Sequence, residues 1–384
     1  MEGVVRLAAA LLSVAVVCGV SHAATDADVE RLVERHVRDA LPENGAGGCA
    51  VAVRLDGRTQ FFNHGRADLA TDRAITPDTL FNLGSLAKAL DATLLADAVR
   101  RGELSLDDPV TKYIPELADG GDIRRVTLGH LGSFSSGLVM RQDRPPWTAT
   151  PHASPAAFLA AIKQWTLEEG REPGRQVNHV HSGFVLLRLV LERRFDMPIA
   201  ELLERRVFAP LGLTSTVLPV AATDRRTHPR GRLPPDLLPR AVQGYGEHGE
   251  PIGGPGDLQG YYYWHGAGQM YSSARDMAAF LAANLGELPD GHPLREAVTL
   301  AQRGVVPFGE QSISALAWER HRLDTGEIVD RYGGTNNASA IIAMMPERKL
   351  GVAILCNRSQ DVATASHDIL NGLTGAERET TGRN

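Results

Sequence analysis

The placement of strand-like segments near both ends of the chain constrains the fold more than any other feature. Residues 49–55 alternate or run apolar, Asp56-Gly57 supplies a hairpin turn, and residues 59–63 form the returning strand. Towards the other end, residues 338–345 and 350–355 are two more β-type runs. A long middle segment separates the two pairs of strands. This arrangement predicts one sheet that is built from both ends of the chain.

The middle of the chain is mostly helical in pattern and is interrupted by loops rich in glycine and proline. Residues 223–256 are rich in proline, arginine and glycine and predict a long surface excursion. Helical spacing covers residues 26–41, 85–101, 155–165, 183–194, 199–206 and 274–285. The chain has 384 residues, more than one simple domain usually needs, which favours two lobes or one large α/β unit.

The first 24 residues have the layout of a secretory signal peptide. An apolar run from Leu7 to Val20 is followed by small residues, with cleavage expected after Ala23 or Ala24. The run is shorter than the roughly 20 residues that span a bilayer. A lipoprotein signal that uses Cys18 is less favoured because bulky Val17 precedes it, and an uncleaved anchor stays open because the start of the chain is only weakly basic. We therefore expect an exported protein, secreted or periplasmic, with no stable membrane insertion after cleavage.

The composition excludes one class of partner and draws attention to one residue. Apolar residues make up 43% of the chain and the net charge is −6, which argues against a nucleic-acid binder that neutralises phosphates. The chain has only four lysines, Lys88, Lys112, Lys163 and Lys349, and its other basic residues are arginines. Because lysines are so rare in this chain, each lysine needs an explanation.

The motif Ser85-Leu-Ala-Lys88 provides such an explanation. Two residues three apart at the start of a helix lie on the same face, with Cβ atoms about 5–6 Å apart. Free backbone N–H groups and the helix dipole favour negative charge on Ser85. A lysine that loses its proton by burial or beside another cation can accept the serine proton, which arginine cannot do. Because S-x-x-K also occurs by chance, the motif alone leaves a nucleophilic role open.

Residues 81–117 (FNLGSLAKALDATLLADAVRRGELSLDDPVTKYIPEL) closely resemble the nucleophile segment of class C β-lactamases and their relatives, the serine DD-peptidases and family VIII-type esterases. Further segments are similar to the Ser-Gly-Leu loop, the Pro-Leu-Gly turn, the Gly-rich turn into a helix and the paired C-terminal strands of that family: 131–138, 207–213, 266–276 and 339–357. The resemblance runs in consistent order from about residue 30 to 370.

The resemblance implies an α/β (α+β) fold in which a five-stranded antiparallel sheet with flanking helices meets a mostly helical lobe. The mature domain would span residues 25–384. Its α/β lobe would comprise about 25–86 and 290–384, and the helical lobe about 87–289. The cleft between the lobes would hold the active site. The implied mechanism proceeds through an acyl-enzyme on Ser85.

The second motif of the family, Tyr-x-Asn, falls on His179-Val180-His181 in this chain. Histidine titrates near 6.5 and needs no strong depression of its pKa to act as a base, so we assign His179 with Lys88 to proton transfer. With His179 as the base, the acidic limb of the pH–rate profile is expected near 6–7. His181 is assigned to substrate binding by hydrogen bonding. A pair of satisfied histidines without a catalytic role stays open.

The third motif, Lys-Thr-Gly in class C enzymes, falls on Arg331-Tyr332-Gly333. Arg331 keeps the positive charge and offers a bidentate fork to a substrate carboxylate. Tyr332 stands in place of a small hydroxyl residue and is expected to line the cleft, which should be narrower there or reshaped. Gly334 matches the position whose N–H joins that of Ser85 in the oxyanion hole. An ordinary edge strand with an exposed arginine is the competing interpretation.

No metal or other cofactor is expected. His179-x-His181 matches the first two positions of a metallo-hydrolase signature, but no Asp-His follows and the remaining histidines are scattered. The sequence thus favours a secreted serine hydrolase or acyltransferase that cleaves an ester or amide bond, including a β-lactam or D-amino-acid peptide, in a small-molecule or peptide substrate. The alternative is a protein that keeps the fold and binds a peptidoglycan fragment, a β-lactam or a metabolite without turnover.

Two cysteines remain after removal of the signal. Cys49 opens the first strand and Cys356 closes the last one, and the resemblance implies that these strands are antiparallel neighbours. In an oxidising compartment such a pair persists as a disulfide. Two separate buried thiols are the alternative, because one residue of register decides whether the side chains share a face.

Overall fold

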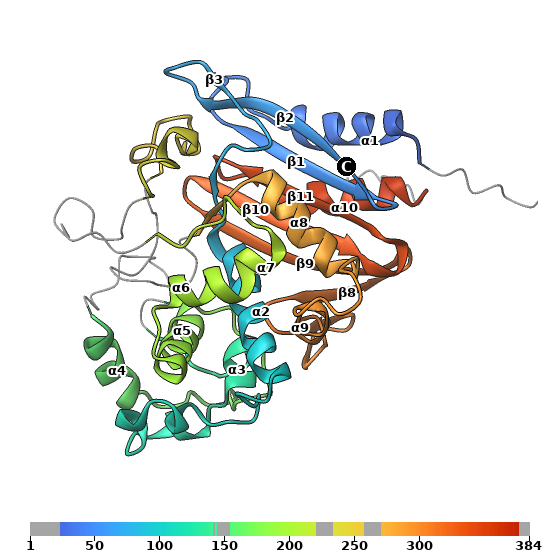
Figure 1. Cartoon of the computed structure of the whole chain (residues 1–384). Helices are drawn as coiled ribbons and strands as arrows, with labels where there is room; N and C mark the ends of the chain where they lie inside the picture. Colours follow the sequence, from blue (N-terminus) through green and yellow to red (C-terminus); the bar gives the residue numbers. More distant parts are fainter. Residues whose placement is uncertain (1–23, 141–142, 144–153, 220–232, 257–269, 376–384) are drawn as a thin grey trace, which may run out of the picture.

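The computed structural model describes residues 24–140, 143, 154–219, 233–256 and 270–375 (Figure 1). The predicted signal peptide lies almost wholly outside these residues, as do residues 266–268 of the predicted Gly-rich turn. Among the described residues, no helix is long and apolar enough to span a membrane.

A nine-stranded antiparallel sheet forms the centre of the molecule, with the order β3-β2-β1-β11-β10-β9-β8-β7-β6. Strand β1 from the start of the chain pairs with β11 from its end, which confirms the prediction of one sheet built from both ends. The strands are β1 (Gly48–Leu55), β2 (Arg58–Asp68), β3 (Arg73–Ala74), β6 (Val306–Phe308), β7 (Ser312–Ser314), β8 (Glu319–Leu323), β9 (Gly326–Thr335), β10 (Ala338–Met345) and β11 (Leu350–Cys356).

The expectation of five strands is wrong, because short strands extend the sheet at both edges. Strands β6, β7 and β8 pair in sequence onto β9, and β3 pairs with β2. The longest of these added strands, β8, reads Glu-Arg-His-Arg-Leu, and all five of its residues are exposed or partly exposed. Backbone pairing to a neighbouring strand, rather than burial of side chains, therefore defines β8.

Helices cover both faces of the sheet (Figure 1). Helices α1 (Asp26–Val33) and α10 (Val362–Leu373) pack on the face that carries Val51, Ile341 and Ile354. The opposite face, which carries Ala50, Ile342 and Ala353, belongs to the larger core that includes α2 and α8. The remaining helices are α2 (Ala87–Arg100), α3 (Leu128–Gly132), α4 (Pro155–Lys163), α5 (His181–Phe195), α6 (Ile199–Leu203), α7 (Ala209–Leu211), α8 (Ala274–Asn284) and α9 (Arg295–Ala301).

Short 3₁₀ or π turns complete the described structure: η1 (Glu34–Arg38), η2 (Gly84–Leu86), η3 (Val110–Lys112), η4 (Pro115–Leu117), η5 (Asp122–Arg125), η7 (Glu204–Phe208), η8 (Leu238–Arg240) and η9 (Pro346–Arg348). A separate pair of short strands, β4 (Phe81–Asn82) and β5 (Tyr271–Ser272), joins the two ends of the mostly helical segment. The nucleophile motif follows directly after β4, so this pairing fixes its position relative to the large sheet.

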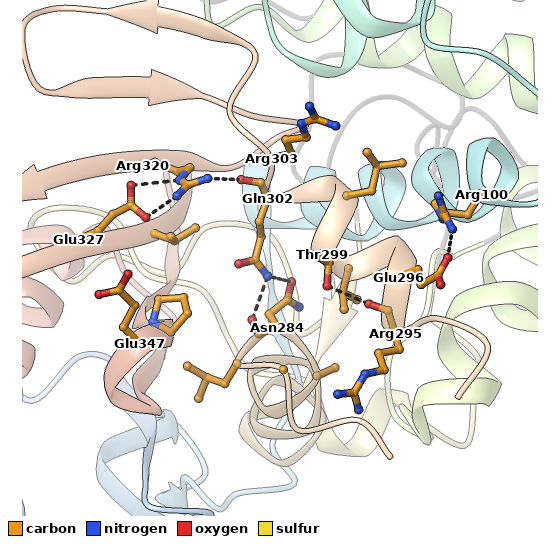
Figure 2. Close-up of a pocket in the computed structure, with 17 residues that line it drawn as sticks. Arg100, Asn284, Arg295, Glu296, Thr299, Gln302, Arg303, Arg320, Glu327 and Glu347 are labelled. Carbon is orange, nitrogen blue, oxygen red and sulfur yellow. Dashed lines mark hydrogen bonds and ion pairs between the residues drawn. The ribbon is translucent and has the colours of Figure 1, made fainter. Parts of the chain in front are cut away.

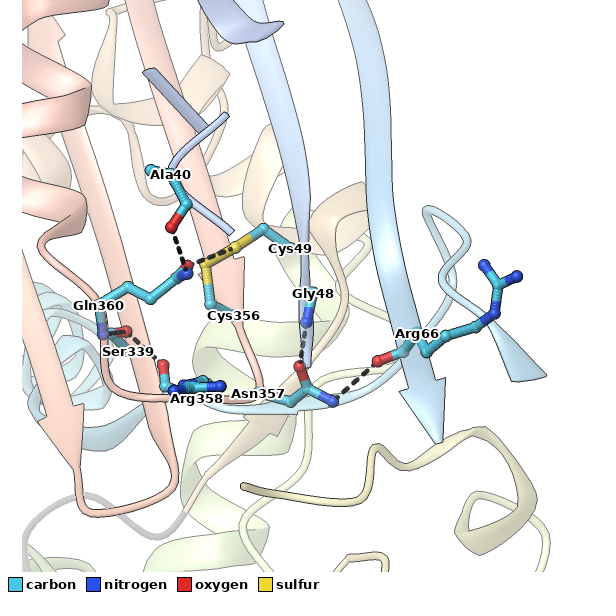
Figure 3. Close-up of a disulfide and its surroundings, with 9 residues drawn as sticks. All are labelled: Ala40, Gly48, Cys49, Arg66, Ser339, Cys356, Asn357, Arg358 and Gln360. Carbon is cyan, nitrogen blue, oxygen red and sulfur yellow. Dashed lines mark hydrogen bonds between the residues drawn. A yellow bond between two sulfur atoms is a disulfide. The ribbon is translucent and has the colours of Figure 1, made fainter. Parts of the chain in front are cut away.

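Cys49 and Cys356 form a disulfide (Figure 3). They stand directly opposite each other in the register of β1 and β11, and their Cα atoms are 4.2 Å apart. The prediction of the bridge is thereby confirmed, and the alternative of two separate thiols is wrong. The bridge ties together the two ends of the chain that build the central strands.

Candidate active site

Ser85 lies in the tight turn η2 between β4 and α2, and two glycines allow that turn to contact β9. Gly84 has a φ of +51°, and a Cβ atom placed on it would lie 2.8 Å from the backbone nitrogen of Gly334. A Cβ atom on Gly333 would lie 2.7 Å from the backbone nitrogen of Ser85. A residue with a Cβ atom could not fit at either position. The two glycines therefore let the backbones of η2 and β9 lie against each other, which brings Gly334 beside Ser85.

Lys88 is buried one helical turn after Ser85, as the spacing predicts. Its Nζ lies 2.7 Å from Ser85 Oγ, and the side chain has no exposed surface. Burial lowers the pKa of Lys88 well below its usual value, and the nearby cations Arg331 and Arg188 lower it further. A neutral amine at this distance can accept the hydroxyl proton of Ser85.

A buried ion pair limits the opposing effect of a carboxylate on Lys88. Asp91 lies three residues after Lys88 and favours the protonated lysine. Arg188 Nη2 lies 3.0 Å from Asp91 Oδ2, and both side chains are buried. The Arg188 guanidinium therefore neutralises the Asp91 carboxylate. The carboxylate then does little to stabilise a positive charge on Lys88.

His181 begins helix α5 and contacts Lys88 rather than open space. Its Nδ1 lies 3.5 Å from Lys88 Nζ, and burial, followed by the charges of Lys88 and Arg331, lowers the pKa of His181 well below 6.5. Asp143 holds this end of the helix: it accepts hydrogen bonds from the backbone N–H of His181 at 2.8 Å and from the hydroxyl of Ser182 at 2.6 Å. These bonds fix the position of His181 against Lys88.

Sequence reasoning missed Asp143. The residue before α5 is Val180, which has no side chain that can cap a helix, and Asp143 lies 38 residues upstream of its partner His181. The usual local signal for a helix start is therefore missing. A capping residue that lies far from the helix in sequence cannot be recognised from the residues next to the helix start.

His179 faces Arg331 instead of Ser85. Its Nε2 lies 2.8 Å from Arg331 Nη2, and its ring stacks on Phe134 with centroids 4.7 Å apart. A guanidinium only donates hydrogen bonds, so the contacted ring nitrogen is an acceptor. Among the hydrogen bonds of the described residues there is none between His179 and Ser85. The lone pair that a general base needs is engaged by Arg331.

The pKa of His179 also argues against the expected acidic limb near 6–7. Burial lowers this pKa well below 6.5, and the positive charges of Arg331 and Lys88 lower it further. His179 is therefore neutral at physiological pH, and its titration falls below the expected range.

Arg331 points into the site, as expected, and the interpretation as an exposed edge arginine is wrong. The side chain is 1% exposed, and its Nε lies 3.3 Å from the carbonyl oxygen of Ser85. The guanidinium also lies over the Phe134 ring at 4.7 Å and faces Glu319. Burial lowers the pKa of Arg331 to about 10, so the group stays a cation at neutral pH. A substrate carboxylate would reach it only by displacing one of these partners.

Tyr332 does not line the cleft, which corrects its assignment to substrate binding. Successive residues of a strand point to opposite faces, so Tyr332 lies on the face opposite Arg331. Its side chain is 41% exposed, and its pKa is raised by partial burial and, to a smaller extent, by the charge of Asp361 at the start of α10. The cleft is therefore not narrowed at this position.

The edge of β9 next to Ser85 is open in the part of the chain that the structure describes. The pairing of β8 with β9 ends at Glu319 and Asp330, whereas β10 pairs with β9 as far as Thr335. Residues 331–335 thus have a strand partner on one side only. An open strand edge beside a nucleophile can hold an extended substrate by backbone hydrogen bonds.

The two histidines of the second motif do not form a metal site. Their ring centroids are 6.5 Å apart, and each ring contacts a basic side chain, Arg331 or Lys88. Neither belongs to a group of three possible metal ligands among the residues described.

A cavity of about 820 Å³ lies at the other end of β9, between α8, α9 and β8 (Figure 2). It is lined by charged side chains, several of them paired with one another, such as Arg320 with Glu327 and Arg100 with Glu296. No residue of the Ser85 site lines it. The cavity is therefore separate from the Ser85 site.

The chain is similar to known proteins over most of its length. The Beta-lactamase family model matches residues 29–376. A β-lactamase of Yersinia enterocolitica is 27% identical, with 91% of this chain and 92% of that protein covered. A β-lactamase of Escherichia coli strain K12 is 25% identical, with 90% and 94% covered.

Solved structures show the same fold. A class C β-lactamase superposes with a TM-score of 0.77 at 22% identity and covers 94% of this chain and 99% of its own. A β-lactamase/D-alanine carboxypeptidase of Pseudomonas syringae superposes with a TM-score of 0.76 at 25% identity and covers 91% and 99%. From the family match and the shared fold, we conclude that this chain belongs to the Beta-lactamase family of serine hydrolases.

Proposed function

We propose that the protein is an exported serine hydrolase or acyltransferase that works through an acyl-enzyme on Ser85. The observation that carries this proposal is the 2.7 Å contact between Ser85 Oγ and the fully buried Lys88. A hydroxyl is a weak nucleophile by itself and needs an adjacent base. Lys88 meets that need by distance and by its lowered pKa.

In the proposed acylation step, Ser85 Oγ forms a bond to the carbonyl carbon of an ester or amide while its proton moves to Lys88 Nζ. The backbone N–H groups of Ser85 and Gly334 stabilise the oxyanion. The intermediate then collapses, the bond to the leaving group breaks, and the leaving group takes the proton from Lys88. Water attacks the acyl-enzyme in hydrolysis, and another nucleophile takes its place in acyl transfer.

We assign supporting roles to the neighbouring side chains. His181 contacts Lys88 and is placed to pass a proton to or from it. Burial favours the neutral form of Lys88, the charge of Arg331 favours it further, and His179 holds Arg331 by accepting a hydrogen bond from the guanidinium. In this proposal Lys88 alone is the general base, whereas the sequence predicts that role for Lys88 and His179 together.

For the substrate we propose an ester or an amide, including a β-lactam or a D-amino-acid peptide. Relatives of the chain are named as β-lactamases and as a β-lactamase/D-alanine carboxypeptidase. The open edge of β9 beside Ser85 favours a substrate that lies extended along the strand. The altered second and third motifs fit a simple ester or amide at least as well as a β-lactam, so the test includes a reagent that is not a β-lactam.

The test is labelling of the mature protein with a fluorescent penicillin and with a fluorophosphonate, followed by mass spectrometry. We expect a covalent adduct on Ser85 with at least one reagent and none in a Ser85→Ala variant. If neither reagent labels a folded protein, the catalytic proposal is wrong and the binding alternative is favoured. Sequencing the N-terminus of protein collected outside the cytoplasm tests export, with a start at Ala24 or Thr25 expected from the predicted cleavage.

A further inference from the structure

A cluster of histidine and acidic side chains lies on the face of the sheet covered by α10, opposite the face that carries Arg331. Glu319 and His321 come from β8, and Asp330 comes from β9. Glu319 stands opposite Asp330 in the strand register, so their side chains share a face, and His321 is two residues along the same strand. His367 of α10 contacts Asp330 from above the sheet. Two strands and a helix thus bring together groups that bind metals.

The distances within this cluster suit a tetrahedral metal ion. His321 Nε2 lies 3.6 Å from Asp330 Oδ1 and 3.8 Å from Glu319 Oε2. The three ligand atoms all lie within 4.8 Å of one another. Zinc bonds of about 2.0–2.1 Å in tetrahedral geometry separate neighbouring ligands by about 3.3–3.4 Å. Small side-chain movements would therefore complete the first three positions of such a site.

Hydrogen bonds outside the three ligands already orient two of them. Ser312 Oγ lies 2.9 Å from His321 Nδ1 and can accept its proton, which leaves the lone pair on Nε2, the nitrogen that faces the carboxylates. His367 Nε2 lies 2.6 Å from Asp330 Oδ2, so the other oxygen of that carboxylate stays available. Outer partners of this kind fix the tautomer and direction of ligands in metal sites.

We propose that Glu319, His321 and Asp330 bind a divalent transition-metal ion of the zinc type, with water at the fourth position. The ligand set of imidazole and carboxylates is one that zinc uses. Glu319 and His321 are 29% and 23% exposed, so an ion can enter from solvent, whereas Asp330 is mostly buried. The site is distinct from the pair His179 and His181.

The site adjoins the active centre through Glu319. Glu319 Oε1 lies 3.5 Å from Arg331 Nη1, and Asp330 precedes Arg331 in β9. A metal bound by Glu319 would draw this carboxylate from the guanidinium that contacts Ser85. The ion would therefore change the environment of Ser85 without contacting it.

The test is titration calorimetry of the disulfide-intact mature protein, freed of metal with a chelator, with Zn²⁺. We expect one ion per chain, and Co²⁺ in its place should give the visible absorption bands of a tetrahedral complex. His321→Ala should weaken binding by more than about tenfold, and Ser312→Ala, which keeps all three ligands, by about 10- to 100-fold. Thermal unfolding of each metal-free variant identifies any that fails to fold, and Ser312→Ala is the change least able to disturb folding.

Two variants serve as controls. His36 is the matched one, because it has the same exposure as His321 and faces a single carboxylate, Asp368, at 3.7 Å. His36→Ala and His181→Ala should leave the affinity unchanged. The proposal is overturned if the wild-type protein binds no stoichiometric Zn²⁺, if Ser312→Ala binds as tightly as wild type, or if His181→Ala rather than His321→Ala abolishes binding.

Discussion

Gly333→Ala is the perturbation that most directly tests how β9 positions the nucleophile. A methyl group at this position would lie 2.1 Å from the carbonyl oxygen of Leu83, 2.4 Å from the nitrogen of Leu86 and 2.7 Å from the nitrogen of Ser85. All three are backbone atoms, so no side-chain rotation can relieve the contacts. Strand β9 and the turn η2 must separate.

The size of that separation sets the expected effect. Even to reach 3.0 Å from the Leu83 oxygen, the methyl group must move by 3.0 − 2.1 = 0.9 Å. Overpacking of this kind costs about 1–3 kcal/mol of unfolding free energy, occasionally more. The same shift moves the N–H of Gly334 away from Ser85, and the loss of one oxyanion donor costs about 10²–10³ in rate. The rate loss corresponds to about 2.7–4 kcal/mol of activation free energy. We therefore expect the activation free energy to change more than the free energy of unfolding.

The assay is the rate of covalent labelling at Ser85 together with urea unfolding, for wild type, Gly333→Ala and Gly254→Ala. Gly254 is the matched control, because a Cβ atom placed there meets nothing within 4 Å. The control should match wild type in both measurements. A Gly333→Ala protein that unfolds within about 0.5 kcal/mol of wild type and labels at an unchanged rate would refute the argument that the close contact of β9 with η2 positions Ser85.

Three further predictions concern other parts of the site and the fold. Lys88→Arg should lower the labelling rate by about 10²–10⁴, because arginine stays protonated; in wild type the rate should fall as pH drops through the pKa of Lys88, well below 10.5, since only the neutral amine accepts a proton. Asp143→Ala should cost about 1–2 kcal/mol of unfolding free energy, the upper range for a lost helix cap, and should slow labelling more than Thr25→Ala, which removes the cap of α1 far from Ser85; equal labelling rates would show that Asp143 does not position His181. Replacing Cys49 and Cys356 together by serine should lower the unfolding free energy by about 5 kcal/mol in the loop-entropy estimate without altering the labelling chemistry, and unchanged urea midpoints would contradict it.

The parts of the fold that could be predicted from sequence are those whose pattern depends on burial. Strands β1, β10 and β11 are buried along most of their length, and their apolar runs are visible in the sequence. Ser85 in η2 and Lys88 in α2 are three residues apart, and this spacing places their side chains on a common face. Strand β8 could not be predicted, because its residues are partly exposed and its existence depends on pairing with β9.

The site was harder to predict where a side chain's direction or partner depends on tertiary structure. A motif of consecutive residues in a strand places only alternate side chains in a cleft, so Arg331 and Tyr332 could not both line it. In the sequence, the changes in the second and third motifs also have no visible connection with each other. The structure brings them together, since His179 Nε2 lies 2.8 Å from Arg331 Nη2. A neutral histidine that accepts a hydrogen bond from the guanidinium leaves one net positive charge in this pair, and that charge favours the neutral form of Lys88. The two altered motifs are thus coupled, and a change in either one is expected to act on the same base.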